Sequence, residues 1–134
     1  MGQQQLLLII LGVIIVGIAI AVGLSLFSAQ SVQANKDAII NDLNNIAANA
    51  YQHRIRPSSM GGGNGAYDAS KGGQAYSIPS KMASNENAAY NPTNVGADAI
   101  DFSAVSVSYP TAYITVTVDS NGKLTGWAYG GEFQ

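Results

Sequence analysis

The sequence has no cysteine and little charge. Its 134 residues include one histidine, no cysteine and 10% charged residues, and the net charge is −2. Without cysteine there is no disulfide, thiolate metal site or cysteine nucleophile, and one histidine cannot build a familiar zinc site. A chain with so little charge also lacks the basic surface that binds nucleic acid. We therefore expect no metal, no cofactor and no nucleic-acid partner.

The sequence also lacks a recognisable catalytic set. Its single histidine, His53, stands beside Arg54 at the end of an expected helix, where the helix dipole favours a cation. Asp98, Asp101 and Asp119 are scattered at turns and strand starts, and no Ser-His-Asp order stands out. We expect a protein that is not an enzyme, and a membrane-anchored enzyme is the least favoured class.

A long apolar segment lies close to the first residue. Leu6–Phe27 contains 22 residues with no charge and one hydroxyl, that of Ser25. As a helix this segment is about 33 Å long, which is enough to cross the hydrocarbon core of a bilayer. A cleaved secretory signal is a weaker interpretation, because the basic leader is missing and the apolar run is too long. Val32-Gln33-Ala34 has the small-residue pattern of a cleavage site, which keeps that alternative open. A plain membrane anchor is a further alternative.

Small and polar residues in this segment are candidates for packing between subunits. Small residues spaced four apart, such as Gly17 and Ala21, let neighbouring helices approach closely. Glutamines at the start of the helix can pair with the free backbone N–H groups of a neighbouring copy without burying a charge. The candidate packing residues are Gln3, Gln4, Gln5, Gly12, Gly17, Ala21 and Gly23.

From Ser28 the pattern becomes amphipathic. Apolar residues recur at helical spacing, with Asp and Asn residues mostly on the other side. No proline or glycine lies between Phe27 and Arg56, so nothing separates this pattern from the apolar segment, and Pro57 ends the helix. We therefore expect one helix over Gln4–Arg56, about 80 Å long. The predicted stripe is Ile39, Leu43, Ile46 and Ala50, widened by Ile40, Ala47 and Tyr51.

Residues 57–134 are expected to form a small, glycine-rich head. Three stretches read as loops, namely Gly61–Gly65, Gly72-Gly73 and Asn91–Asn94. Tyr76–Ile78 is a candidate short strand, and Lys81–Ala83 a turn. The glycine-rich loop follows a helix and has no Gly-Lys-Ser/Thr after it, so the pattern does not support phosphate binding.

Alternating residues at the C-terminal end predict a three-stranded antiparallel meander over 100–130. Its strands are Ile100–Tyr109, with a bulge near Ser103–Ala104, Tyr113–Val118 and Lys123–Tyr129. Asp119–Gly122 is a strong hairpin signal between the last two strands. The only partner for the apolar face of this sheet is the helical stripe, so the predicted core of the head is Ile39, Leu43, Ile46, Ile114 and Val116.

The chain therefore reads as an α+β protein with three regions. Residues 1–27 form an apolar transmembrane or filament-core helix, residues 28–56 continue it as an amphipathic helix, and residues 57–134 form the β head. The head contains six of the seven tyrosines and the one tryptophan, which we interpret chiefly as core or subunit packing, with adhesion through exposed rings as a weaker alternative.

This plan resembles the type IV pilins and the related pseudopilins. The resemblance covers the whole chain as architecture and rests on few specific residues. It implies that Met1-Gly2 is the leader and that Gly2 is the processing site. The chain departs from the family in having no basic leader, in carrying Leu7 where the family has Glu, and in lacking a proline in the apolar helix.

The resemblance implies a structural subunit of an extracellular, type IV pilus-like helical filament at the cell surface, with heads available for adhesion or surface attachment. The implied partners are other copies of the chain, the cytoplasmic (inner) membrane before assembly, and the pilus assembly machinery. The alternatives are a single-pass membrane-anchored protein and a minor pseudopilin of a secretion-type complex.

Overall fold

A single long helix dominates the N-terminal part of the protein. The computed structural model describes residues 2–134. Helix α1 (Gly2–Ile55) is continuous over 54 residues, in agreement with the uninterrupted helix expected from the sequence. The chain divides into two compact units whose boundary falls between Ala34 and Asn35, within α1. The two units are described separately below.

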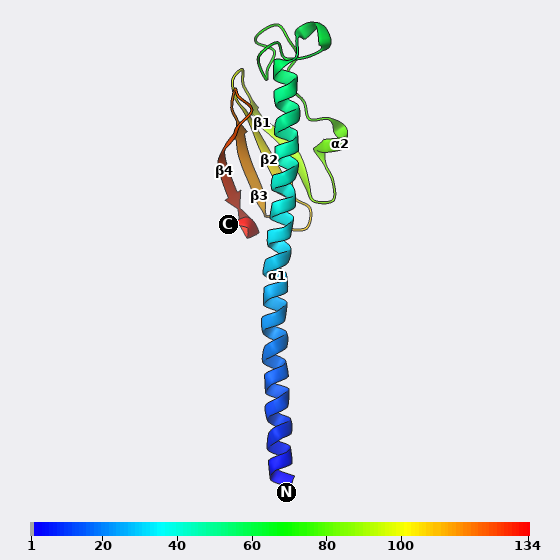
Figure 1. The fold of residues 1–134 in the computed structure, drawn as a ribbon, viewed down its shortest axis with the longest axis vertical. Helices are drawn as coiled ribbons and strands as arrows, with labels where there is room; N and C mark the ends of the chain where they lie inside the picture. Colours follow the sequence, from blue (N-terminus) through cyan, green and yellow to red (C-terminus); the bar gives the residue numbers. More distant parts are fainter. Residues whose placement is uncertain (1) are drawn as a thin grey trace. The chain divides into compact units, whose positions relative to one another are not determined.

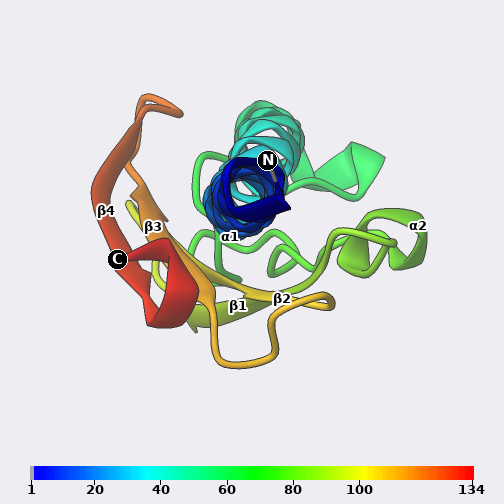
Figure 2. The ribbon, with the colours of Figure 1, turned by 90° about the horizontal axis from the view of Figure 1, so that it is seen from below.

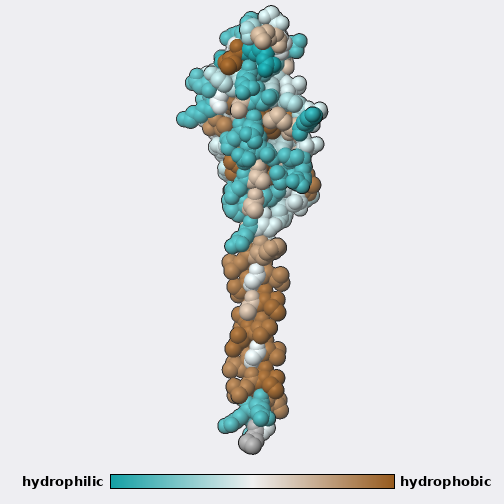
Figure 3. Space-filling model, turned by 45° about the vertical axis from the view of Figure 1, so that its right-hand side comes forward, coloured by the Kyte–Doolittle hydropathy of each residue, from teal (hydrophilic) through white to brown (hydrophobic). Residues whose placement is uncertain are grey.

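The N-terminal unit consists of the first part of α1. The face seen in Figure 3 is hydrophobic over most of this helical segment and hydrophilic where the helix begins. Helix α1 is long enough and apolar enough to cross a membrane. The structure therefore agrees with the sequence on a long apolar N-terminal helix.

The C-terminal unit packs the rest of α1 against a four-stranded antiparallel sheet. The strands are β1 (Ala88–Val95), β2 (Ile100–Ser106), β3 (Tyr113–Val118) and β4 (Leu124–Gly130), paired in the order β1-β2-β3-β4. They lie along α1 (Figure 1) and curve around it (Figure 2). The short helices α2 (Ser80–Ala83), η1 (Ser58–Met60) and η2 (Gly131–Phe133) complete an α+β fold.

The core lies between the amphipathic stripe of α1 and the inner face of the sheet. Ile39, Leu43 and Ala50 are completely buried, and Ile46 is 1% exposed. The sheet contributes buried side chains from alternate positions of its strands, because successive residues of a strand point to opposite faces. These are Tyr90, Ile100, Phe102, Ala104, Ile114, Val116 and Val118. All five predicted core residues are buried.

The predicted three-stranded meander is wrong by one strand. Asn91–Asn94, expected to be a loop, lies within β1. Pro92 is tolerated there because β1 is an edge strand, and the ladder has an irregularity between Pro92 and Asn94. Lys81–Ala83, expected to be a turn, belongs to α2, and Tyr76–Ile78 forms no strand.

The expected bulge at Ser103–Ala104 is also wrong. Strand β2 keeps one alternation from Ile100 to Ser106 and pairs with β3 without a shift. The change of phase in the sequence arises because Val105 and Val107 are apolar residues on the exposed side, whereas Ser106 is polar and buried. Burial, rather than the hydropathy of individual residues, sets the phase of the strand.

The glycine-rich loop closes the C-terminal end of α1. The backbone N–H groups of Gly63, Asn64 and Gly65 donate to the carbonyl oxygens of His53, Arg56 and Arg54. A helix end leaves carbonyl groups without partners, and this loop satisfies them. A Cβ on Gly63 would fall on the carbonyl oxygen of Ala66, so the loop needs glycine for close backbone contact.

Candidate assembly surface

The apolar side chains of Leu6–Phe27 form a continuous exposed surface on α1. Every leucine, isoleucine, valine and phenylalanine in this segment is between 50% and 72% exposed. Single exposed apolar residues are ordinary, whereas large contiguous apolar patches mark membrane or protein interaction sites. This surface is the candidate site of the protein.

The glycines of this surface are not required by packing within the chain. A Cβ placed on Gly12, Gly17 or Gly23 would meet nothing within 4 Å. Each of these glycines also lies inside α1, where glycine is less favourable than alanine by about 1 kcal/mol. The space beside them is therefore open to a neighbouring molecule.

The small residues occupy two sides of the helix. Gly17 and Ala21 are four residues apart and share one side, whereas Gly12 and Gly23 are eleven residues apart, which is about three turns, and share another. The step of five residues from Gly12 to Gly17 turns the helix by about 140°. A helix with two such sides can contact two neighbours at once, whereas a single stripe suits a pair.

The three glutamines are at the start of the described helix. Gln3, Gln4 and Gln5 are exposed residues in the first two turns of α1, and the first turn contains no acidic residue. Gly2, the predicted processing site, is the first residue of the helix. Met1 lies outside the described residues.

A polar cluster fixes the sheet against α1 in the C-terminal unit. Asp42 Oδ2 accepts hydrogen bonds from Tyr90 Oη at 2.6 Å, Asn85 Nδ2 at 2.9 Å and Asn87 Nδ2 at 3.3 Å. Burial alone would raise the pKa of Asp42, but the three hydrogen bonds together lower it. Burial also raises the pKa of Tyr90, and the bond to Asp42 adds to that effect.

The sequence pattern missed this cluster. It placed the Asp and Asn residues mostly on the polar side of the helix, and two of them, Asp42 and Asn49, are half-buried beside the packed stripe. Asn49 Oδ1 accepts a 2.8 Å bond from Tyr76 Oη. At the other end of the stripe, Ser106 Oγ donates to Asn35 Oδ1 at 2.6 Å. The one signal in the sequence was that these polar residues stand next to residues of the apolar stripe. Helical periodicity alone does not show that such neighbours bond to the sheet.

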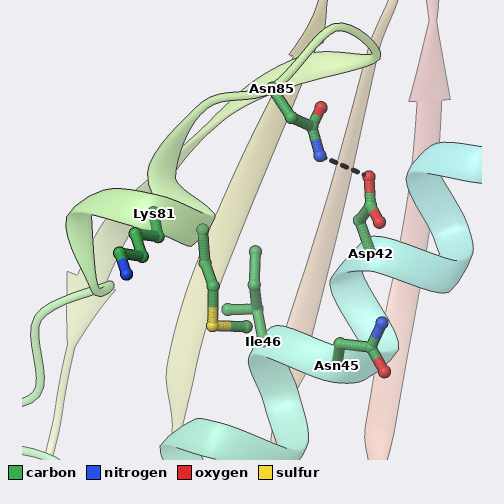
Figure 4. A pocket seen from close by; sticks show the side chains of 6 residues that line it. Asp42, Asn45, Ile46, Lys81 and Asn85 are labelled. Carbon is green, nitrogen blue, oxygen red and sulfur yellow. Dashed lines mark hydrogen bonds between the residues drawn. The ribbon is translucent and has the colours of Figure 1, made fainter.

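A small cavity lies beside the Asp42 cluster, between α1 and the α2 segment (Figure 4). Its volume is about 140 Å³, and its lining residues are Asp42, Asn45, Ile46, Lys81, Met82 and Asn85. The bond from Asn85 to Asp42 joins two of these lining residues (Figure 4). Within residues 2–134, no group of three or more His, Cys, Asp or Glu side chains is placed to hold a metal ion.

Most of the aromatic side chains of the head are buried or half-buried. Tyr67, Tyr76 and Tyr90 are buried, and burial raises the pKa of both Tyr67 and Tyr76 to about 12. Trp127 and Tyr129 are half-buried and nearly parallel, with ring centroids 6.3 Å apart. This distribution agrees with the packing interpretation for the buried rings.

The single histidine, His53, contacts the loop that follows the helix. His53 Nε2 lies 2.7 Å from the carbonyl oxygen of Gln74, and its ring meets that of Tyr76 edge to face. The neighbouring Arg54 pairs with Asp98 at 3.4 Å. His53 therefore helps to hold the loop that follows the helix.

Comparison with known proteins adds no family to this description. The chain matches no protein-family model, and neither the curated proteins nor the solved structures contain a match.

Proposed function

We propose that this chain is the structural subunit of an extracellular, type IV pilus-like helical filament. The observation that carries the proposal is the exposed apolar surface of Leu6–Phe27, on a helix that continues into a unit with its own core. The core of the C-terminal unit is already filled by the stripe of α1. The apolar surface must therefore be covered by lipid or by other chains.

The open glycines favour other chains as the final environment. Lipid tails do not require a groove, whereas closely packed helices do. Small residues on two sides of α1 give each helix two places for a neighbour. In the proposed filament, the apolar helices pack into a central bundle and the C-terminal units form the outer layer.

The same surface would anchor the subunit in the membrane before assembly. A helix of this length and composition is stable in the cytoplasmic membrane, which would hold the subunit until the assembly machinery extracts it. Within the filament, the apolar side chains then exchange lipid for the side chains of other copies. Adhesion or surface attachment would be a role of the outward-facing parts of the C-terminal units.

Fractionation combined with microscopy tests this proposal. Filaments sheared from the cell surface are examined by negative-stain electron microscopy and probed for the full chain. The proposal predicts that the protein is in helical filaments in preparations without detergent. If the protein is found only in membranes and only as a monomer, it is a single-pass anchored protein and the proposal fails.

A further inference from the structure

The exposed large apolar residues of the C-terminal unit fall into two groups. Among the described residues from Asn35 onwards, they are Ile55, Met60, Val105, Val107 and Tyr113. Ile55 and Met60, here called the distal residues, are 57% and 69% exposed. Val105, Val107 and Tyr113, here called the proximal residues, are 38%, 58% and 43% exposed.

Contacts within the unit place these groups at opposite ends. Ser106, between two of the proximal residues, bonds to Asn35 at the start of the unit's helical segment. The β3–β4 turn is at the other end, because Gly122 lies against the ring of Tyr51. The distal residues follow at the end of α1 and in η1. Twenty residue steps separate Asn35 from Ile55, so the two ends are about 30 Å apart.

Two of the proximal residues, Val105 and Tyr113, belong to an apolar row on the outer face of the sheet, and Val107 follows directly after β2. Ala89, Val105, Tyr113 and Gly130 are neighbours across all four strands, and a Cβ on Gly130 would fall on the Tyr113 ring. The next row on this face is mostly polar: Asn91, Ser103, Thr115 and Ala128. Further along come Asp101, Thr117 and Thr125. The outer face is thus apolar at one end only.

The distal residues lie on a backbone that is fixed by hydrogen bonds and close contacts. Met60 N donates to the carbonyl oxygen of Pro57 at 3.0 Å, which fixes η1 directly after the helix. Gly62 N donates to the same carbonyl at 3.1 Å, and a Cβ on Gly62 would fall on Arg56. The backbone that carries Ile55 and Met60 is therefore fixed at the end of the unit.

We infer that the distal residues of one copy dock on the proximal residues of the next copy along the filament. This inference rests on the proposed function. In a filament whose copies all point the same way, the distal end of one copy faces the proximal end of the next, so each apolar group meets the other kind. Their pairing is heterologous, and a heterologous contact that does not close into a ring builds an open helical assembly. The head contact therefore adds to the contact between the apolar helices.

Pairing of introduced cysteines tests this contact, since the natural chain has none. Full-length chains carrying Met60→Cys and Val107→Cys are produced together, so that both enter the same filaments. After mild oxidation, disulfide-linked dimers are measured on denaturing, non-reducing gels. A disulfide forms only where the two Cα atoms come within about 7 Å of each other, so it reports a close contact. A second pair, Ile55→Cys with Tyr113→Cys, samples the same contact at different positions.

The mixture is expected to give several-fold more dimer than either variant alone. The matched control replaces Met60→Cys by Ala128→Cys, which is exposed on the edge strand β4 and outside both apolar groups, and it is expected to give no excess. Dimers formed equally well by Met60→Cys alone or Val107→Cys alone would overturn the heterologous arrangement. Intact filaments in which neither pair cross-links would overturn the contact while leaving the proposed function in place. Absence of filaments from the unsubstituted chain would overturn both.

Discussion

The hydroxyl group of Tyr90 donates a 2.6 Å hydrogen bond to Oδ2 of Asp42, which lies 48 residues earlier in the chain. The bond joins strand β1 to helix α1. Asn85 and Asn87 donate to the same oxygen, so one carboxylate holds strand β1 and two residues of the segment that leads into it. The stability of the C-terminal unit should therefore depend on the charge of Asp42.

Tyr90→Phe is expected to destabilise a fragment that begins at Ser28 by about 1.5–3 kcal/mol at pH 7, the usual range for a hydrogen bond to a charged group. Because the pKa of Asp42 is lowered in the folded unit, its contribution is complete above the ordinary value of 3.8 and is lost as the pH falls through the folded pKa. Urea unfolding of both forms at pH 7 and at acid pH measures this effect. The difference between them should shrink in acid, and an equal difference at both pH values would contradict this role for Asp42.

Leu43→Ala tests the packing of the helix on the sheet. Leu43 is completely buried in the middle of the stripe, and such truncations cost about 2–5 kcal/mol. This is a large part of the stability of a small unit, so the same fragment should be soluble but only weakly stable. Denaturant unfolding provides the measurement. A loss below about 0.5 kcal/mol would mean that Leu43 faces solvent or another subunit in solution.

The loop that closes α1 is packed against Gly73, which gives a prediction of its own. Gly73→Ala would bring a Cβ within 2.5 Å of the carbonyl oxygen of Gly62, so it should lower the melting temperature of the fragment. Gly72→Ala is not a neutral control, because Gly72 has a φ of 82° that favours glycine. Ala75→Ser, at an exposed loop position, is a better one and should leave the melting temperature almost unchanged. Equal melting temperatures for Gly73→Ala and Ala75→Ser would show that the loop can open at little cost.

How far the sequence predicts this fold depends on how each signal is encoded. The long helix, its buried stripe and the Asp119–Gly122 hairpin follow from local periodicity and turn residues, and all three are confirmed. Strand β1 was missed because Pro92 and its Asn neighbours resemble a loop, and only the edge position in the sheet makes them acceptable.

The site divides in the same way. The apolar surface and its glycines are visible in the sequence because they form a continuous run. The Asp42 cluster and the two end groups of apolar residues depend on contacts between distant parts of the chain. Val105 and Val107 suggested a bulge, because hydropathy alone does not distinguish a buried apolar residue from an exposed one.

Substitution of an open glycine tests the packing of the apolar helices. Gly17→Leu is expected to reduce filament yield strongly while the C-terminal unit stays folded, because a bulky side chain separates neighbouring backbones. Ile18→Leu, at an adjacent exposed position, conserves volume and is the control. Filament mass per cell and circular dichroism of the purified protein are the two measurements. Unchanged filament yield would show that Gly17 faces no neighbour.

The glutamines at the start of α1 are predicted to set the axial register between subunits. Replacing Gln3, Gln4 and Gln5 together by alanine removes side chains that can pair with free backbone N–H groups of a neighbouring helix. Assembly should fall more than membrane insertion, which depends on the apolar run. Quantifying the chain in membrane and sheared fractions separates the two. An equal loss in both fractions would point to a role in insertion instead.

Electron cryomicroscopy with helical reconstruction of the sheared filaments shows whether the apolar helices form a filament core. We expect density for this chain with the Leu6–Phe27 helices at the filament centre, packed through Gly12, Gly17, Ala21 and Gly23, and with the C-terminal units outside. Filaments in which these helices do not contact one another, or the recovery of the chain only as a detergent-solubilised monomer, would contradict it.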